Sequence, residues 1–205
     1  MTAISPSSRL VLADRVIPRG IVTDIALVVG GALFTALLAQ VEIPLWPVPI
    51  TGQTLAVLLV GATLGAVRGG SALLLYMILG FAGLPFYAPN PDGSHLTGLA
   101  AVAAPSFGYI IGFIPAAAFV GWLSERTWDR KFLKALATFI GGSLVVFAIG
   151  VPWLAVVLGA SFTEALEWGV YPFIVGGIIK AVIAALLLPA AWWGADKLAA
   201  RRSAD

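Results

Sequence analysis

Six long apolar segments dominate the sequence and constrain its fold more than any other feature. A transmembrane helix needs about 20 predominantly apolar residues, whereas a strand of a membrane barrel needs alternating polarity over about ten residues. The segments are apolar on every face, so we predict an all-α integral membrane protein with six transmembrane helices. They lie near residues 22–40, 52–67, 69–85, 106–124, 133–158 and 172–195.

Helix breakers of different kinds separate the segments. The stretch 43–49 holds three prolines, the glycines in 67–70 predict a tight turn, and 85–105 is a long loop bounded by prolines. In a six-helix topology the proline-rich stretch and the long loop lie on the same side of the membrane.

The composition indicates that the bilayer is the main solvent. Apolar residues make up 60% of the 205 positions and charged residues only 11%, whereas an average soluble domain is about 25% charged. A disordered chain, a secreted disulfide scaffold and an ordinary cytosolic enzyme are therefore excluded. The sequence contains no cysteine, so it can form neither a disulfide framework nor a thiolate metal site. The net charge is only +2, and we expect no nucleic-acid partner.

The basic residues segregate in the six-helix topology. The two termini and the second and fourth connections share one side, and 11 of the 12 Lys and Arg residues lie there. The opposite connections hold none, and the twelfth, Lys180, lies inside the sixth segment. Because cytoplasmic loops carry an excess of Lys and Arg, we expect both termini in the cytoplasm. The predicted units are a cytoplasmic tail (1–19), a membrane domain (20–197) and a second cytoplasmic tail (198–205).

Lys180 points most directly to a ligand site. If the sixth helix enters the membrane at Pro172, a rise of about 1.5 Å per residue puts Lys180 roughly 12 Å below the outer surface. An ammonium there costs on the order of 2–3 kcal/mol, so it normally pairs with another group or contacts a ligand. Gly176 and Gly177 lie on the same helical face and leave a recess for a small anionic molecule or a polar ring. The alternative is a lysine that extends to the outer headgroups.

The outer connections complete the candidate pocket. Irregular backbone at membrane depth is tolerated where it lines a cavity, so we interpret 44–53 and 86–105 as caps over a pocket that opens outward; ordinary connectors are the alternative. Thr51, Gln53 and Tyr109 are polar groups that could bond a ligand. Three aromatic residues could form apolar walls or simply anchor and pack the protein: Trp46, Phe107 and Phe173.

The first apolar segment contains small residues four positions apart, Ala32 and Ala36. This spacing lets helix backbones approach closely. The sequence leaves open whether the neighbouring helix is internal or belongs to a second protein.

Catalytic motifs are missing from the sequence. There is no Gly-x-x-x-x-Gly-Lys-[Ser/Thr] loop, so the chain cannot bind and hydrolyse ATP in the usual way. The single histidine, His95, is not part of a His-Glu-x-x-His motif, which excludes an intramembrane metalloprotease. With no convincing nucleophile–base pair either, we expect no enzyme, cofactor or metal site.

A series of short motifs runs through nearly the whole chain beyond residue 20. Residues 47–54 read Pro-Val-Pro-Ile-Thr-Gly-Gln-Thr, and residues 172–180 read Pro-Phe-Ile-Val-Gly-Gly-Ile-Ile-Lys. Together they resemble the BioY family, the biotin-specific substrate-capture (S) components of energy-coupling-factor (ECF) transporters. Less specific matching elements lie at 64–70, 75–76, 83–85, 105–113 and 150–154.

This resemblance implies a biotin pocket near the outer surface of a bacterial-type plasma membrane, with Lys180 as the family's pocket lysine. It also implies a transmembrane coupling subunit and two cytoplasmic ATPases as partners. Ala32 and Ala36 resemble the face that meets the coupling subunit.

One position departs from the family pattern. Three residues before Lys180 the family usually has an aspartate that serves the ligand's polar ring, and this sequence has Gly177. We hypothesise that a residue of the 86–105 loop replaces it, with Asn90, Asp92 and His95 as the candidates. The alternatives are an uptake subunit for another small vitamin and a solitary, homo-oligomeric biotin transporter.

Overall fold

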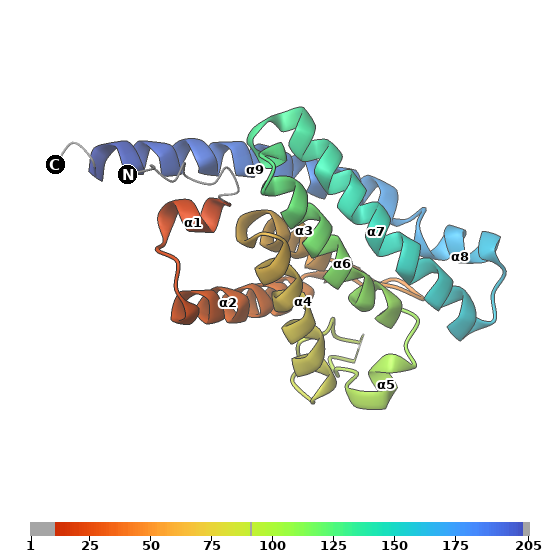
Figure 1. Cartoon of the computed structure of the whole chain (residues 1–205). Helices are drawn as coiled ribbons and strands as arrows, with labels where there is room; N and C mark the ends of the chain where they lie inside the picture. The colour runs from red at the N-terminus through yellow and green to blue at the C-terminus, as the bar shows by residue number, and fades with distance from the viewer. Residues whose placement is uncertain (1–10, 91, 203–205) are drawn as a thin grey trace.

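Each of the six apolar segments folds into a helix in the computed structural model, which describes residues 11–90 and 92–202, the last four by backbone alone. Residues 1–10 and 203–205 of the two predicted tails lie outside the described residues. The six helices are α2 (Ile21–Ala39), α3 (Gln53–Leu64), α4 (Ala66–Phe81), α6 (Phe107–Ser124), α7 (Phe132–Leu158) and α9 (Phe173–Arg202). The expected helical fold is confirmed (Figure 1).

Four of these helices are long and apolar enough to cross a membrane: α2, α6, α7 and residues 173–198 of α9. Helices α3 and α4 are also apolar but have only 12 and 16 residues. Six membrane crossings and their orientation therefore stay predictions.

The short elements occupy the connections. They are α1 (Leu12–Val16), β1 (Glu42–Ile43), β2 (Ile50–Thr51), α5 (Gly98–Val102), the 3-10 helix η1 (Trp128–Arg130) and α8 (Phe162–Gly169). Strands β1 and β2 form an antiparallel pair with Glu42 opposite Thr51. The sequence patterns missed this ladder because two residues per strand are too few for a periodicity.

The tight turn predicted at 67–70 is wrong, because those residues lie inside α4. The chain turns at Gly65 alone, whose φ of +87° is accessible to glycine at little cost. Gly69 serves packing instead: a Cβ there would lie 3.0 Å from the Cα of Gly61 in α3.

Helix α6 lies at the centre of the fold and packs against α3, α4 and α7 (Figure 1). Two glycines set its distance from the preceding helices. A Cβ on Gly61 would lie 2.5 Å from the carbonyl oxygen of Ala117, and one on Gly121 would lie 2.3 Å from the carbonyl carbon of Gly65. Main chain therefore meets main chain on both sides of this contact.

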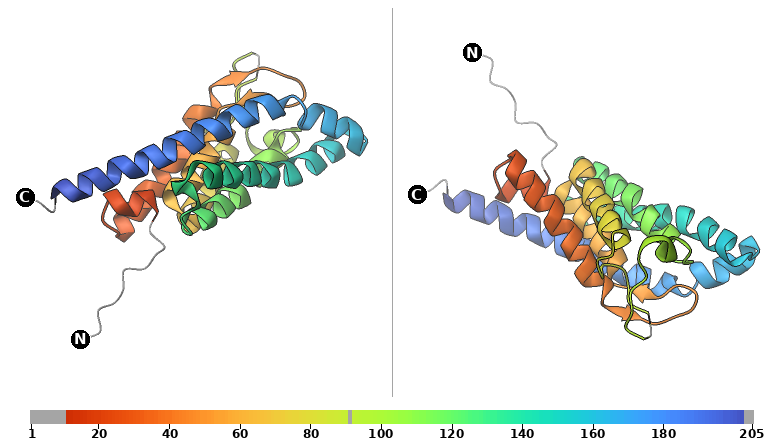
Figure 2. Two further views of the ribbon diagram at one scale, coloured as in Figure 1. Left: turned by 90° about the horizontal axis from the view of Figure 1, so that it is seen from above. Right: turned by 90° about the horizontal axis from the view of Figure 1, so that it is seen from below.

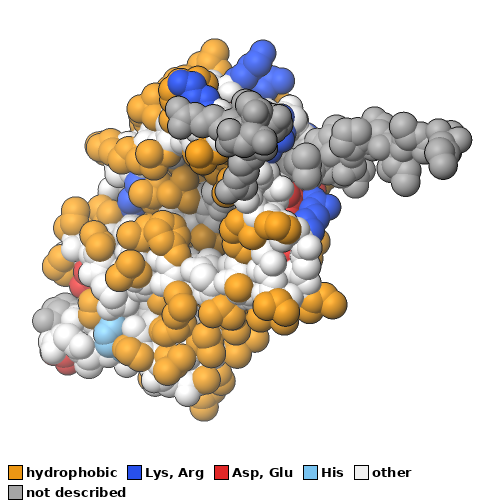
Figure 3. Space-filling view, turned by 90° about the vertical axis from the view of Figure 1, so that its left-hand side faces the viewer, with side chains coloured by type: hydrophobic (Ala, Val, Ile, Leu, Met, Phe, Trp, Pro, Cys, Tyr) orange, Lys and Arg blue, Asp and Glu red, His pale blue; other side chains and the backbone are white. Residues whose placement is uncertain are grey.

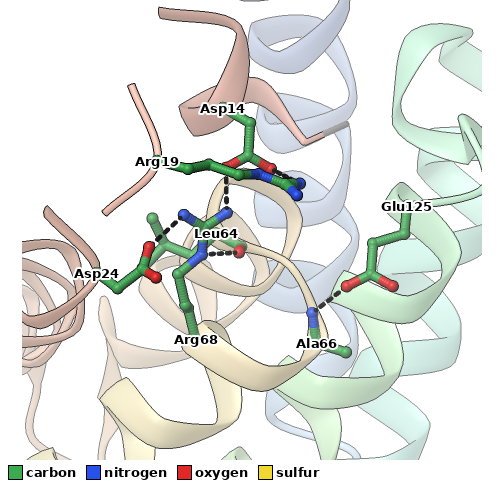
Figure 4. Close-up of polar contacts among 7 residues, drawn as sticks. All are labelled: Asp14, Arg19, Asp24, Leu64, Ala66, Arg68 and Glu125. Carbon is green, nitrogen blue, oxygen red and sulfur yellow. Dashed lines mark hydrogen bonds and ion pairs between the residues drawn. The ribbon is translucent and has the colours of Figure 1, made fainter. Parts of the chain in front are cut away.

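Ion pairs and hydrogen bonds gather the basic connections at one end of the molecule. Arg68 donates to Asp14 at 2.7 Å and Asp24 at 3.0 Å, and its Nε donates to the carbonyl oxygen of Leu64 at 2.9 Å (Figure 4). Glu125, at the end of α6, accepts from the backbone N–H of Ala66 at 2.9 Å. These contacts join the start of α2, the α3–α4 junction and the end of α6.

The end of α9 joins the same region. Asp196 pairs with Arg15 of α1 at 2.9 Å, and the indole N–H of Trp192 donates to Asp129 of η1 at 2.6 Å. Asp129 is buried, and burial raises the pKa of its carboxyl. On the face shown in Figure 3, the Lys and Arg side chains lie in the upper half and hydrophobic side chains cover much of the rest.

The opposite ends of the helices meet the β1–β2 loop and the connection between α4 and α5. Both segments lie beside each other in the two views of Figure 2. The Gln40 amide, just beyond α2, links them by donating to the carbonyl oxygens of Pro85 and Tyr87 at 3.4 Å.

Candidate functional site

A cavity of about 430 Å³ lies at the end of the helices away from the basic connections. Its lining comes from the β1–β2 loop, the start of α3, residues 87–90 and 104–107, α6, α7 and the start of α9. The volume falls within the range of about 300–1,000 Å³ typical of small-molecule sites. The segments predicted to cap a pocket, 44–53 and 86–105, both contribute to it.

Aromatic rings form much of the wall. Trp46, Phe107 and Phe173, named from the sequence as candidate walls, all line the cavity. Tyr87 packs edge-on against Phe107 with ring centroids 6.2 Å apart, and Phe147 packs against Phe173 at 6.3 Å. These contacts hold the rings in place around an apolar space.

Lys180 supplies a cation to this wall. Its half-buried side chain turns toward the β2–α3 junction, where the ammonium donates to the carbonyl oxygen of Thr51 at 2.5 Å and to the Thr54 hydroxyl at 3.0 Å. An ammonium has three N–H donors, so one donor remains for a ligand. The alternative of a lysine extending away from the protein does not fit this geometry.

Thr51 and Gln53 line the cavity, but their side chains bond within the protein. The Thr51 hydroxyl donates to Gln53 Oε1 at 2.7 Å, and the Gln53 amide donates to the hydroxyl of the buried Tyr76. These bonds fix the β2–α3 junction, and with it the carbonyl oxygen that accepts from Lys180. In the structure, both residues thus position the main chain that Lys180 contacts.

Tyr109 lines the cavity. Its hydroxyl donates to the carbonyl oxygen of Gly169 at 2.9 Å, and its ring stacks on Phe173 with centroids 6.3 Å apart. The hydroxyl proton is therefore engaged within the protein, but its oxygen can still accept, so a hydrogen bond between Tyr109 and a ligand stays a prediction.

Of the loop residues named to replace the missing aspartate, one lines the cavity and two do not. Asn90 lines the cavity, but its amide donates to the Ser94 hydroxyl at 2.9 Å. His95 and Asp92 are not part of the lining; His95 Nδ1 bonds the carbonyl oxygen of Tyr87 at 2.8 Å. Asp92 accepts from the Ser94 hydroxyl at 2.6 Å, and that bond lowers its pKa.

Only one of the two glycines before Lys180 lines the cavity. Gly177 lines the cavity, and a Cβ there would meet nothing within 4 Å. Gly176 is not part of the lining, and a Cβ there would meet Ile50 at 3.8 Å. The predicted recess is therefore next to Gly177.

Glu42 is a lining residue that the sequence reasoning missed. It lies on β1 opposite Thr51, and its Oε2 is buried without a hydrogen-bond partner. Burial raises the pKa of this carboxyl, and the nearby His95 acts in the opposite direction. Its position directly before the proline-rich stretch was the one available signal.

Ala32 and Ala36 are covered by this chain's own helices. Ala32 is fully buried and Ala36 nearly so, in the core that includes Val60 of α3 and Ala72 of α4. The small-residue spacing therefore serves packing within this chain, and a contact of these two residues with a partner subunit stays a prediction. The exposed face of α2 instead carries large apolar residues such as Leu33 and Leu37.

Among residues 11–90 and 92–202, no group of three or more His, Asp or Glu side chains is arranged to hold a metal ion.

Comparisons with known proteins agree with one another. The sequence model described as "BioY family" matches residues 7–197. The "Biotin transporter BioY" of Rhizobium etli is 39% identical over 183 residues, which cover 83% of this chain and 95% of that protein. The "Probable biotin transporter BioY" of Pyrococcus horikoshii is 36% identical over 164 residues, covering 80% and 93%.

A solved structure described as the "S-component for biotin from an ECF-type ABC transporter" superposes with a TM-score of 0.69. Its sequence is 22% identical to this one, and the match covers 82% of this chain and 90% of that chain. This likeness shows that the two share a fold.

Proposed function

This chain belongs to the BioY family, and we propose that it is a membrane subunit that captures biotin and delivers it inward. The chain is a membrane protein of a transporter family and not an enzyme. The observation that carries the proposal is the cavity of about 430 Å³. Aromatic rings form its wall, and the Lys180 ammonium, which uses two of its three N–H donors within the protein, has one left for a ligand.

The cavity chemistry suits biotin. Its fused ring and pentanoate chain offer apolar surface to Trp46, Phe107 and Phe173, and its carboxylate offers acceptors to the Lys180 ammonium. A charge-assisted hydrogen bond in a largely apolar pocket supplies orientation, and the rings supply contact area. Thr51 and Gln53 act by fixing the β2–α3 junction, whose carbonyl oxygen accepts a hydrogen bond from Lys180.

We propose that the cavity opens outward. The end that gathers Arg15, Arg68 and Arg126 fits a cytoplasmic side, and the connections around the cavity contain Glu42, Asp92 and other acidic residues but no Lys or Arg. With α3 and α4 counted as crossings, we propose six crossings of a bacterial-type plasma membrane and both termini in the cytoplasm.

Transport then needs an energy source from outside the chain. The sequence has no nucleotide-binding loop of its own, and the solved relative is described as part of an ECF-type ABC transporter. We therefore propose a transmembrane coupling subunit and cytoplasmic ATPases as partners.

Isothermal titration of biotin into the purified chain tests the proposal. We expect saturable one-to-one binding that Lys180→Ala weakens by tenfold or more. Because Gly177 stands where the family usually has an aspartate, other vitamins are added as competitors. A vitamin that displaces biotin at equal concentration would replace biotin as the assigned ligand, and no biotin binding would overturn the proposal.

Uptake of radiolabelled biotin in cells with and without a coupling subunit tests the partners. We expect uptake to require that subunit. Undiminished uptake in its absence would instead support a solitary transporter.

A further inference from the structure

The cavity contains a second charged group, of opposite sign to Lys180. Glu42 and Lys180 lie on either side of β2: Glu42 is the ladder partner of Thr51, and Lys180 donates to the carbonyl oxygen of that same residue. Among the described residues, neither side chain forms an ion pair with the other or with any other charged group. The cavity lining thus contains a cation and a carboxyl group that are not paired with each other.

Most of the other polar side chains in the lining already form hydrogen bonds within the protein, as donors or, for Thr54, as an acceptor. The residues whose bonds show this are Thr51, Gln53, Thr54, Tyr87, Asn90 and Tyr109. Of the described lining side chains, Glu42 alone has a buried polar atom without a partner. A buried polar group left unbonded is costly and calls for an explanation.

Resting on the proposed function, we propose that Glu42 is a specificity-determining residue that accepts a hydrogen bond from a ureido N–H of biotin. A carboxylate has only acceptors, and each ureido nitrogen of biotin carries one hydrogen, so the two groups are complementary. The free oxygen of Glu42 gains a partner when the ligand binds, and a ligand without an N–H donor leaves it unpaired. This geometry selects biotin's polar ring at the Glu42 side and leaves its carboxylate to Lys180.

This assignment also accounts for Gly177. The aspartate that the family resemblance places there is absent, and of the loop residues named to replace it only Asn90 reaches the lining, with its amide engaged. Glu42 brings a carboxyl group into the same cavity from the first loop.

The test compares Glu42→Gln and Glu42→Ala with the unmodified chain, by titration with biotin and with two analogues that are each methylated on one ureido nitrogen. The matched control is Glu167→Gln, which changes an exposed carboxylate of α8 outside the cavity. We expect both Glu42 variants to bind biotin about tenfold to hundredfold more weakly. The unmodified chain should discriminate against at least one analogue, and the Glu42 variants should lose most of that discrimination. The control should bind like the unmodified chain.

Three outcomes distinguish the two claims. If the unmodified chain does not bind biotin, the proposed function fails. If it binds biotin and both Glu42 variants keep full affinity, only the role of Glu42 is overturned. Equal weakening toward biotin and both analogues would mean that Glu42 supports the loop structurally, which also overturns the inference. Thermal unfolding of each variant verifies that the folded protein is being measured. If one variant does not fold, the N–H contact is still tested by whether the unmodified chain binds biotin more tightly than the methylated analogues.

Discussion

The ammonium of Lys180 on α9 donates to the main-chain carbonyl oxygen of Thr51, 129 positions earlier, at 2.5 Å. The contact joins the last helix to the β1–β2 hairpin at the wall of the cavity. A main-chain acceptor persists whatever side chain stands at position 51. The lysine is therefore held in place before a ligand arrives, which lowers the entropic cost of binding.

Changing Thr54 should separate positioning from binding. Thr54→Val removes one acceptor of the Lys180 ammonium while leaving the bond to Thr51. We expect biotin affinity to fall by about threefold to tenfold, less than for Lys180→Ala, because a typical hydrogen bond contributes about 0.5–1.5 kcal/mol. Calorimetric titration measures both. A larger loss for Thr54→Val than for Lys180→Ala would contradict the assignment.

The buried polar chain at the β2–α3 junction should be important for stability. Gln53→Leu removes the partner of the Thr51 hydroxyl and of the buried Tyr76 hydroxyl, and unsatisfied buried groups cost about 1–3 kcal/mol each. We expect a clearly lower midpoint of thermal unfolding in detergent. The control is Thr163→Leu, which replaces an exposed polar side chain of α8 by leucine. Equal midpoints for the two variants would argue against the role of this chain of bonds.

The close approach of α3, α4 and α6 should make Gly121 intolerant of a side chain. A Cβ there would lie 2.3 Å from the Gly65 carbonyl carbon, and backbone cannot move aside cheaply. We expect Gly121→Ala to destabilise by about 1–3 kcal/mol or more, as overpacking does. In Gly30→Ala the new methyl group meets nothing within 4 Å, and alanine's higher helix propensity should keep stability equal or raise it slightly. Thermal unfolding of both variants checks the contrast.

Stability should depend on pH through Asp14. Burial pushes the pKa of this carboxyl upward, but hydrogen bonds from Arg19 and Arg68 outweigh that effect and hold the pKa below its usual value of 3.8. A depressed pKa contributes stability above the unfolded-state pKa and loses it as the pH falls through the folded-state value. We expect the stability gap between the unmodified chain and Asp14→Asn to be constant near neutral pH and to shrink below about pH 4. A gap that widens on acidification would show that the sign is wrong.

The sequence predicted most of the helices because a bilayer imposes a simple rule. A helix that crosses the bilayer is predominantly apolar along its length, so the six apolar runs were visible without knowledge of their neighbours. Lys180 was visible for the same reason, as a charge that interrupts an apolar run. Its partner Thr51 could not be predicted, because the contact depends on how α9 meets a loop more than a hundred residues earlier.

The contacts that the sequence did not reveal have a common cause. The turn at Gly65, the internal packing of Ala32 and the engaged hydroxyl of Tyr109 all depend on which surface faces which neighbour. Spacing along one helix does not contain that information. Glu42 was missed because a two-residue strand gives no pattern, and its importance comes from the burial of one oxygen in the folded chain.

The bare contacts that Gly61 and Gly121 create have a mechanical consequence. No side chain stands between the helices at these points that could change its rotamer and let one slide along the other, so we expect the middle of the fold to be stiff. We therefore expect a molecule that enters the cavity to displace the β1–β2 loop and the 86–105 segment, which contribute to the lining, without parting these helices.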